Sequence, residues 1–264
     1  MQVTNITIGA DPELFIINTK TNKIVSAIGI IPGEKGKPYT KNIEPGGFGV
    51  EIDGILGEFN IPPCITKDDF VNSIKYMKDW ITDYVKSYNP DYDILCKASS
   101  LVPKDQLLDP LANAIGCMPD FNVYTERENP KPEGYTNCKR VAGFHLHLGY
   151  DNPNIKTSLQ LIKYMDVYVG IPSVLYDTDK YRRTLYGQAG SFRKTSYGCE
   201  YRTLSSYMLH DELLPMVWDQ TMLAIKHCNL QTELPDATLV QDCINKSNKT
   251  LAKHLIKIFN LCAV

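Results

Sequence analysis

The sequence lacks a long apolar run and an excess of charge of one sign. No stretch approaches the roughly 20 consecutive apolar residues that a membrane-spanning helix needs, so we expect no association with a membrane. The 28 lysines and arginines nearly balance the 30 aspartates and glutamates, which leaves a net charge of -2. Because a protein that coats nucleic acid is usually strongly basic, we expect no extended nucleic-acid surface. This balance does not exclude a small basic pocket.

Several common signatures are also absent. The sequence contains neither a P-loop, GxxxxGK[ST], nor a GxGxxG fingerprint after a strand, and it has no GxSxG elbow. Its eight cysteines include no CxxC pair. We therefore expect reduced thiols, several of them in the core, rather than disulfides or a zinc site. The N-terminal residues lack the basic and apolar regions of a secretory signal, and we expect a cytoplasmic protein.

The residues that are present are typical of a soluble globular chain. With 264 residues, 43% of them hydrophobic and 22% charged, the chain can bury a sizeable core. The patterns predict short strands at 6–8, 14–17, 23–25, 50–52, 141–150 and 200–204. They predict helices over about 67–87, 155–176, 211–229 and 236–261. Because the strands cluster and few helices separate them, we predict a single α+β domain over residues 1–264 with a largely antiparallel sheet.

Two carboxylates share one face of a predicted strand in the segment GADPELF. Alternation places Asp11 and Glu13 on one face and Leu14 and Ile16 on the other. Carboxylates this close repel each other unless a cation neutralises them, and carboxylate oxygens are ligands that divalent cations prefer. The pattern therefore predicts a pair of metal ligands. A solvated strand end with a chance acidic pair is the alternative.

A second acidic group follows in the segment VEIDGILGEFNIPP. Asp53-Gly54 is a turn signal, so the segment predicts a hairpin that brings Glu51 or Asp53 near Glu58. Glu58 lies within an apolar strand, where burial of an unpaired carboxylate would be costly. We therefore expect a metal ion or a basic partner beside Glu58. The alternative is an exposed glutamate at a sheet edge.

Two of the five histidines, His145 and His147, lie two residues apart in the predicted strand GFHLHLG. Alternation points both imidazoles to one face, and Gly143 and Gly149 allow another backbone to approach closely. A histidine pair on one face indicates a metal or catalytic site. The alternative is a pair of histidines that are hydrogen-bonded within the sheet.

Arginines and glycines are concentrated in the segment YRRTLYGQAGSFR. Arg182, Arg183 and Arg193, together with Gly187 and Gly190, could fold over an anion. Arginine favours this interpretation because its planar guanidinium binds phosphate with two hydrogen bonds. A solvated surface loop is the alternative.

Glu200 and Arg202 lie on the same strand face in the segment CEYRTLSS. They could form a structural ion pair. An acid and a base presented together also suit a site that binds metal and phosphate.

In this order, the five segments resemble the catalytic domain of glutamine synthetase, whose fold is shared by glutamate–cysteine ligases and guanidino kinases. The resemblance is greatest to the phage-encoded carboxylate–amine ligases of the second type (phiEco32-like). It covers residues 9–206 and leaves the two predicted C-terminal helices outside its motifs. It implies a curved, largely antiparallel sheet with flanking helices.

The resemblance also implies two or more divalent ions, Mg²⁺ or Mn²⁺. The ligands of one ion would be Glu13, Glu58 and either Glu51 or Asp53. The ligands of the other, which bridges the phosphates of ATP, would be Asp11, His145 and Glu200. Asp11 stands where glutamine synthetase usually has a glutamate, and the spacing of the second segment differs, so Glu51 and Asp53 remain alternatives.

Further roles follow from the same resemblance. His147 would lie near the transferred phosphoryl group, and Arg193 and Arg202, with Arg182 or Arg183, would stabilise the charge on it. The residues implied to contact ATP are Arg183, Arg193, Gly187 and Gly190.

The activity implied is ATP-dependent formation of an amide or peptide bond between a carboxylate and an amine, in the host cytoplasm if the chain is phage-encoded. The substrates would be small molecules or peptides. Two other hypotheses are a guanidino kinase-like phosphotransferase on the same fold and a binding module without catalytic activity.

Overall fold

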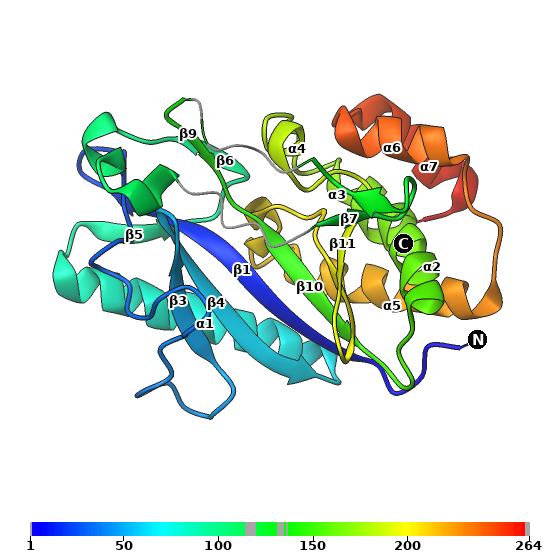
Figure 1. The fold of residues 1–264 in the computed structure, drawn as a ribbon, viewed down its shortest axis with the longest axis horizontal. Helices are drawn as coiled ribbons and strands as arrows, with labels where there is room; N and C mark the ends of the chain where they lie inside the picture. The colour runs from blue at the N-terminus through cyan, green and yellow to red at the C-terminus, as the bar shows by residue number, and fades with distance from the viewer. Residues whose placement is uncertain (1, 114–119, 131–134, 136, 262–264) are drawn as a thin grey trace.

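The computed structural model describes residues 2–113, 120–130, 135 and 137–261 (Figure 1). A large open sheet runs through this part of the chain, and every neighbouring pair of its strands is antiparallel. Its strands, in spatial order, are β3 (Gly49–Asp53), β4 (Leu56–Cys64), β1 (Thr7–Asn18), β10 (Phe144–Gly149), β12 (Gly198–Tyr201), β11 (Ser191–Lys194), β7 (Phe121–Asn122) and β8 (Arg127–Glu128). The long strand β1 therefore lies beside strands from both halves of the chain.

Shorter strands extend this framework. The second half of β1 pairs with β2 (Lys23–Val25) and β5 (Tyr92–Leu95). A separate two-stranded ribbon is formed by β6 (Ser99–Leu101) and β9 (Lys139–Val141). The connecting 3₁₀ turns are η1 (Lys104–Leu107), η2 (Pro110–Asn113) and η4 (Ser206–Leu209).

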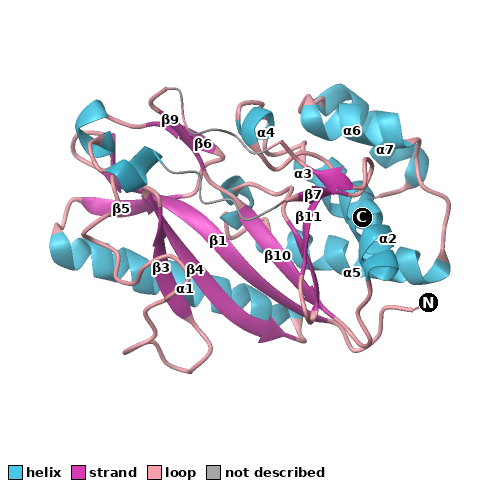
Figure 2. Ribbon diagram, viewed as in Figure 1, coloured by secondary structure: helices cyan, strands magenta, loops and turns pink. Residues whose placement is uncertain are grey.

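Helices pack on one face of the sheet (Figure 2). The principal ones are α1 (Lys67–Tyr88), α2 (Ile155–Met165) and α5 (Leu214–Leu230). Helix α1 begins where Thr66 accepts a hydrogen bond from the Asp69 amide, as in a capping box. Its buried side chains recur every three or four residues and pack in the main core: Phe70, Ile74, Met77, Ile81 and Val85.

The two faces of β1 have different surroundings. Ala10, Leu14 and Ile16 belong to the main core beneath the helices. Asp11 and Glu13 project to the opposite face, as alternation predicts. Further along that face, Phe15 packs in a smaller core with Ile24, Ile55, Leu56 and Ala142 among others. The acidic side chains thus lie on a sheet whose other face is held by apolar packing.

The α+β class with an antiparallel sheet is confirmed, but several element boundaries differ from those predicted. The strands predicted at 6–8 and 14–17 are one strand, β1. The strand predicted at 141–150 is interrupted at Gly143 and forms β9 and β10. The strand predicted at 200–204 is β12, which ends at Tyr201.

The helical predictions also need correction at two places. The helix predicted at 155–176 continues from α2 through a π-helical turn, η3 (Asp166–Gly170), into α3 (Ile171–Ser173). The helix predicted at 236–261 is two helices, α6 (Ala237–Asn245) and α7 (Lys249–Phe259). The chain breaks at Ser247, whose backbone is in the left-handed region with φ of 45°. The Asn248 side chain then caps α7 by accepting a hydrogen bond from the Leu251 amide. A short helix, α4 (Arg182–Leu185), lies in the arginine-rich segment.

The described cysteines agree with the expectation of thiols. Cys64, Cys96, Cys138, Cys199, Cys228 and Cys243 are free, and all except Cys138 are buried. Cys117 and Cys262 lie outside the described residues. Within the described part of the chain, no helix is both long and apolar enough to cross a membrane.

Two methionines test how much the main core contributes to the free energy of unfolding. Met77 on α1 is fully buried, whereas Met222 on α5 is 36% exposed. We predict that Met77→Ala lowers the free energy of unfolding by about 2–5 kcal/mol, because it leaves a cavity. Met222→Ala should change it by about 0.5 kcal/mol or less. Urea unfolding measures both, and equal losses would contradict the assignment of this core.

Candidate functional site

The register of the sheet gathers acidic side chains on the face opposite the helices. Residues directly opposite each other on antiparallel strands project to the same face. Glu58 of β4 lies opposite Glu13 of β1 on one side and Glu51 of β3 on the other. Asp53, two residues after Glu51, projects the same way. The predicted β3–β4 hairpin therefore places four carboxylates on one surface.

Three of these carboxylates form a compact group. Glu13, Asp53 and Glu58 each offer an oxygen, and the three oxygens lie within 4.8 Å of one another. Burial raises the pKa of Glu58 well above its ordinary value, and the negative charges of Asp11, Asp53 and Glu13 raise it further. Burial and the charge of Glu13 raise the pKa of Asp53. Three carboxylates in this arrangement require a positive charge to be ionised together.

Glu13 is held in place by two hydrogen bonds to one oxygen. The Gly143 amide donates to Oε2 at 2.6 Å, and the Tyr186 hydroxyl donates to the same atom at 2.8 Å. Position 143 requires glycine because a Cβ there would lie 2.6 Å from His145 Nε2. The interruption between β9 and β10 thus turns a backbone amide towards the acidic group.

The alternatives Glu51 and Asp53 have different surroundings. Asp53 lies in the three-carboxylate group and contacts Lys35, whose Nζ is 2.5 Å from Asp53 Oδ2. Glu51 Oε2 instead accepts a hydrogen bond from the Gly36 amide at 2.9 Å. The structure therefore brings Asp53, rather than Glu51, together with Glu13 and Glu58.

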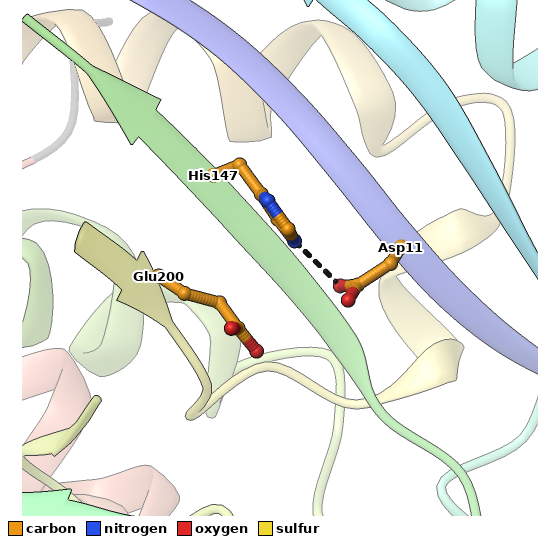
Figure 3. A group of neighbouring side chains, drawn as sticks. All are labelled: Asp11, His147 and Glu200. Atoms are coloured by element: carbon orange, nitrogen blue, oxygen red, sulfur yellow. Dashed lines mark ion pairs between the residues drawn. The ribbon is translucent and has the colours of Figure 1, made fainter. Parts of the chain in front are cut away.

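A second group of possible metal ligands lies on β1, β10 and β12. Asp11, His147 and Glu200 converge from these three strands with ligand atoms within 4.8 Å of one another (Figure 3). His147 Nε2 lies 3.1 Å from Asp11 Oδ1. His145 Nδ1 also reaches this group, at 3.3 Å from Asp11 Oδ1 and 3.6 Å from Glu200 Oε1. Both histidines of the predicted pair therefore lie beside Asp11.

The charges in the second group support one another. Burial raises the pKa of Asp11, but the nearby His147 and His145 lower it by more, so the net pKa lies well below its usual range. Burial lowers the pKa of His147, but Asp11 and Glu200 together raise it by more. The His147 ring stacks on Tyr197, whose hydroxyl bonds to Nδ1. This contact fixes the orientation of the imidazole.

Two arginines complete the second group. Arg193 NH1 lies 3.1 Å from Glu200 Oε2, and Arg202 pairs with the other oxygen of Glu200. Arg202 Nε also lies 3.5 Å from Asp120 Oδ1. Burial lowers the pKa of Arg202, but Glu200 and Asp120 raise it above its usual range. The Arg193 side chain is 29% exposed, and among the described residues its Nε has no hydrogen-bond partner. The pair with Glu200 therefore leaves part of this guanidinium exposed.

The remaining residues of the arginine-rich segment lie elsewhere. Arg182 is buried and donates to the backbone oxygens of Thr203 and Arg202, at 2.8 and 3.1 Å. Arg183 is also buried, 3.9 Å from Asp177. Among the described residues, neither guanidinium pairs with an acid of the two groups: Arg182 supports the backbone of Arg202 and Thr203, and Arg183 faces Asp177. Of the three arginines in this segment, Arg193 is thus the one that the structure places beside the second group.

The two glycines of that segment serve the same packing. A Cβ at Gly187, where φ is 74°, would lie 1.9 Å from Arg182 NH1. A Cβ at Gly190, where φ is 79°, would lie 2.7 Å from the Tyr124 ring. Both glycines permit close approach of side chains from within the protein. Their contact with ATP stays a prediction.

The structure also adds residues that the sequence patterns did not single out. Lys35, Asp120, Tyr186 and Tyr197 all contact a side chain of the two groups. The lysine lies in the turn GEKGK, where flanking glycines were a signal for a tightly folded loop. The other three have no local pattern, because long-range packing alone brings them to the site.

A family of known proteins matches the second half of the chain. Residues 134–259 match the family described as phage phiEco32-like COOH.NH2 ligase-type 2. The resemblance to this ligase family is confirmed. The matched region contains both histidines, Arg193, Glu200 and Arg202, whereas Asp11, Glu13, Asp53 and Glu58 precede it. No curated protein matches the chain.

Two solved structures are similar to most of the chain. A glutamine synthetase from Plasmodium falciparum has 12% identity and a TM-score of 0.46, over 88% of this chain and 53% of that one. A structure described as a novel glutamine synthase homolog has 13% identity and a TM-score of 0.40, over 97% of this chain and 64% of that one. The chain therefore spans between half and two thirds of the length of these two proteins.

The crowding of carboxylates around Glu58 predicts an unusual pH dependence of stability. A glutamate in the unfolded chain has a pKa of about 4.3. In the folded protein the pKa of Glu58 is higher, because the carboxyl is buried beside other acids. The folded state then binds the proton more tightly, so the metal-free protein loses stability as pH rises through the folded pKa. At pH 8, Glu58→Gln should therefore raise the free energy of unfolding by about 1–3 kcal/mol.

Urea unfolding in the presence of a chelator, at pH 4 and pH 8, measures this effect. The two proteins should have nearly equal stability at pH 4. Glu212→Gln is the control, because Glu212 is exposed. A Glu58→Gln protein that is less stable than wild type at pH 8 would contradict the proposed repulsion.

Proposed function

We propose that this chain is an ATP-dependent carboxylate–amine ligase that forms an amide or peptide bond through an acyl phosphate. The observation that carries the proposal is the convergence of two acidic groups, two histidines and Arg193 on one sheet face. The match of residues 134–259 to a carboxylate–amine ligase family supports the same reaction class.

The two acidic groups fit divalent ions. Glu13, Asp53 and Glu58 would hold one ion, and Asp11, Glu200 and a histidine would hold the other. Oxygen-rich sets with at most one or two imidazoles suit Mg²⁺ or Mn²⁺. The crowded carboxylates are consistent with such ligands, as is the buried Asp11 Oδ1, which has no hydrogen-bond partner among the described residues. Bound ions would supply neutralisation and orientation of the triphosphate of ATP.

The side chains of the chain itself would then bind and orient the reacting groups. The free part of the Arg193 guanidinium would stabilise the charge on the transferred phosphoryl group, which gains from fixed positive charge. Arg202, only 5% exposed between Glu200 and Asp120, would act as a positioning residue for Glu200. Tyr197 would hold the imidazole of His147, and Tyr186 and Gly143 would hold the carboxylate of Glu13.

Two bonds are exchanged in this reaction. A carboxylate oxygen of the substrate attacks the γ-phosphorus of ATP, and the bond from that phosphorus to ADP breaks. The nitrogen of the amine then attacks the carbonyl carbon of the acyl phosphate. The bond from carbon to the phosphate oxygen breaks, the amine loses a proton, and the products are an amide, phosphate and ADP.

Product analysis tests this proposal directly. We expect protein incubated with ATP, Mg²⁺ and panels of carboxylates and amines to release ADP and phosphate in equal amounts with an amide product. Hydroxylamine in place of the amine should give a hydroxamate from the acyl phosphate. ADP release without free phosphate would indicate a guanidino kinase-like phosphotransferase instead. A folded protein that turns over no combination would favour a binding module.

The substitution Glu58→Gln should lower the activity and raise the stability of the protein. Glu58→Gln removes a charged ligand from the first group, so we predict that kcat falls by about 100-fold or more while the metal-free protein becomes more stable at pH 8. The exposed Glu212→Gln should change neither quantity. Steady-state kinetics at saturating ATP and Mg²⁺ measure kcat. Full activity of Glu58→Gln would remove Glu58 from the proposed ligands.

A further inference from the structure

Lys35 provides a positive charge at the group formed by Glu13, Asp53 and Glu58. Its Nζ lies 2.5 Å from Asp53 Oδ2. The ammonium also interacts electrostatically with Glu58 and Glu13. Among the described residues, Asp53 is the acid with which Lys35 forms an ion pair. The lysine thus occupies the electrostatic role that the proposed function gives to a divalent ion.

The loop that carries Lys35 is attached to β3 at two points. Tyr39 and Val50 exchange backbone hydrogen bonds of 2.8 and 3.0 Å. The Gly36 amide donates to Glu51 Oε2 at 2.9 Å. Gly33 lets the loop pass close to β3, since it has a φ of 89° and a Cβ there would lie 2.4 Å from Val50 O. The backbone beside Lys35 is therefore tethered.

The side chain of Lys35 is less constrained than this backbone. It is 44% exposed and ends in a flexible ammonium, which can leave the acids by rotation about its side-chain bonds. A divalent ion held by Asp53 and the ammonium beside the same carboxylate would repel each other. Glu51 therefore has a role outside the acidic group, because it anchors the loop that holds the competing cation.

We propose that Lys35 is a tethered counter-cation that competes with the divalent ion for the Glu13, Asp53 and Glu58 group. This inference rests on the proposed function, since it requires that these acids bind a metal ion. Binding of the ion displaces the ammonium, and the tether keeps it at the rim of the site. There it can contact an anionic ligand such as the triphosphate, so that binding of the ion prepares the site for the nucleotide.

Binding of Mn²⁺ to the metal-free full chain, without nucleotide, tests the competition. We expect Lys35→Met to bind Mn²⁺ about 10-fold more tightly than wild type, because a competing unit charge is removed. Free Mn²⁺ is measured by electron paramagnetic resonance and the affinity by calorimetry. Lys37→Met is the matched control, since Lys37 lies in the same turn, is highly exposed and pairs with Glu34 at 3.8 Å.

Further variants separate the possible outcomes. Glu51→Gln should tighten Mn²⁺ binding in the same direction but by less, because it weakens the tether of the loop. Equal or weaker binding by Lys35→Met, compared with wild type, would overturn the inference while leaving the metal assignment intact. No Mn²⁺ binding by any of these proteins would overturn the metal assignment, and the inference with it.

The stability of the variants gives a second readout. Without metal, Lys35→Met should unfold at a lower temperature than wild type, since the acids lose their cation. Saturating Mn²⁺ should raise its Tm by more than it raises that of wild type. If Lys35→Met does not fold without metal, Lys35→Gln carries the same test. An equal rise of Tm in wild type and variant would contradict the competition.

Discussion

Repulsion among carboxylates on one face of the sheet is the constraint on which the site depends. Asp11 and Glu13 from β1, Asp53 and Glu58 from the adjoining hairpin, and Glu200 from β12 share this face. Partial burial increases the repulsion, because the dielectric constant near a protein interior is lower than that of water. The apolar packing of the opposite face against the helices holds the strands together despite this repulsion. The main core therefore permits the acidic groups to exist.

The two groups differ in how far the chain itself balances their charge. Two histidines and two arginines surround Asp11 and Glu200. Within the described part of the chain, the other group is paired with one lysine, on a loop. This difference explains why the pKa of Asp11 is lowered while that of Glu58 is raised. Of these two carboxylates, Glu58 is the one whose ionised form depends more on an added cation.

The arginine-rich segment illustrates how the same residue type can serve two purposes. Arg193 keeps an exposed edge beside Glu200, whereas Arg182 uses its hydrogen bonds on two backbone oxygens. A buried guanidinium needs such partners, since an unpaired charge in the interior is costly. Composition indicates that arginines are available near the site. Only their burial decides which of them can reach a ligand.

Local patterns in the sequence determined which side chains share a strand face. Alternation along a strand places Asp11 and Glu13 on one face, and likewise His145 and His147. These placements and the turn at Asp53-Gly54 depend on neighbouring residues alone, so they were predictable. The tertiary structure alone decided the register between β1 and β10, strands more than 120 residues apart, and with it the meeting of Asp11 and both histidines. It also decided between Asp53 and Glu51, and it brought Lys35 to the acids. These choices depend on long-range packing and on the path of a loop, which no local periodicity records.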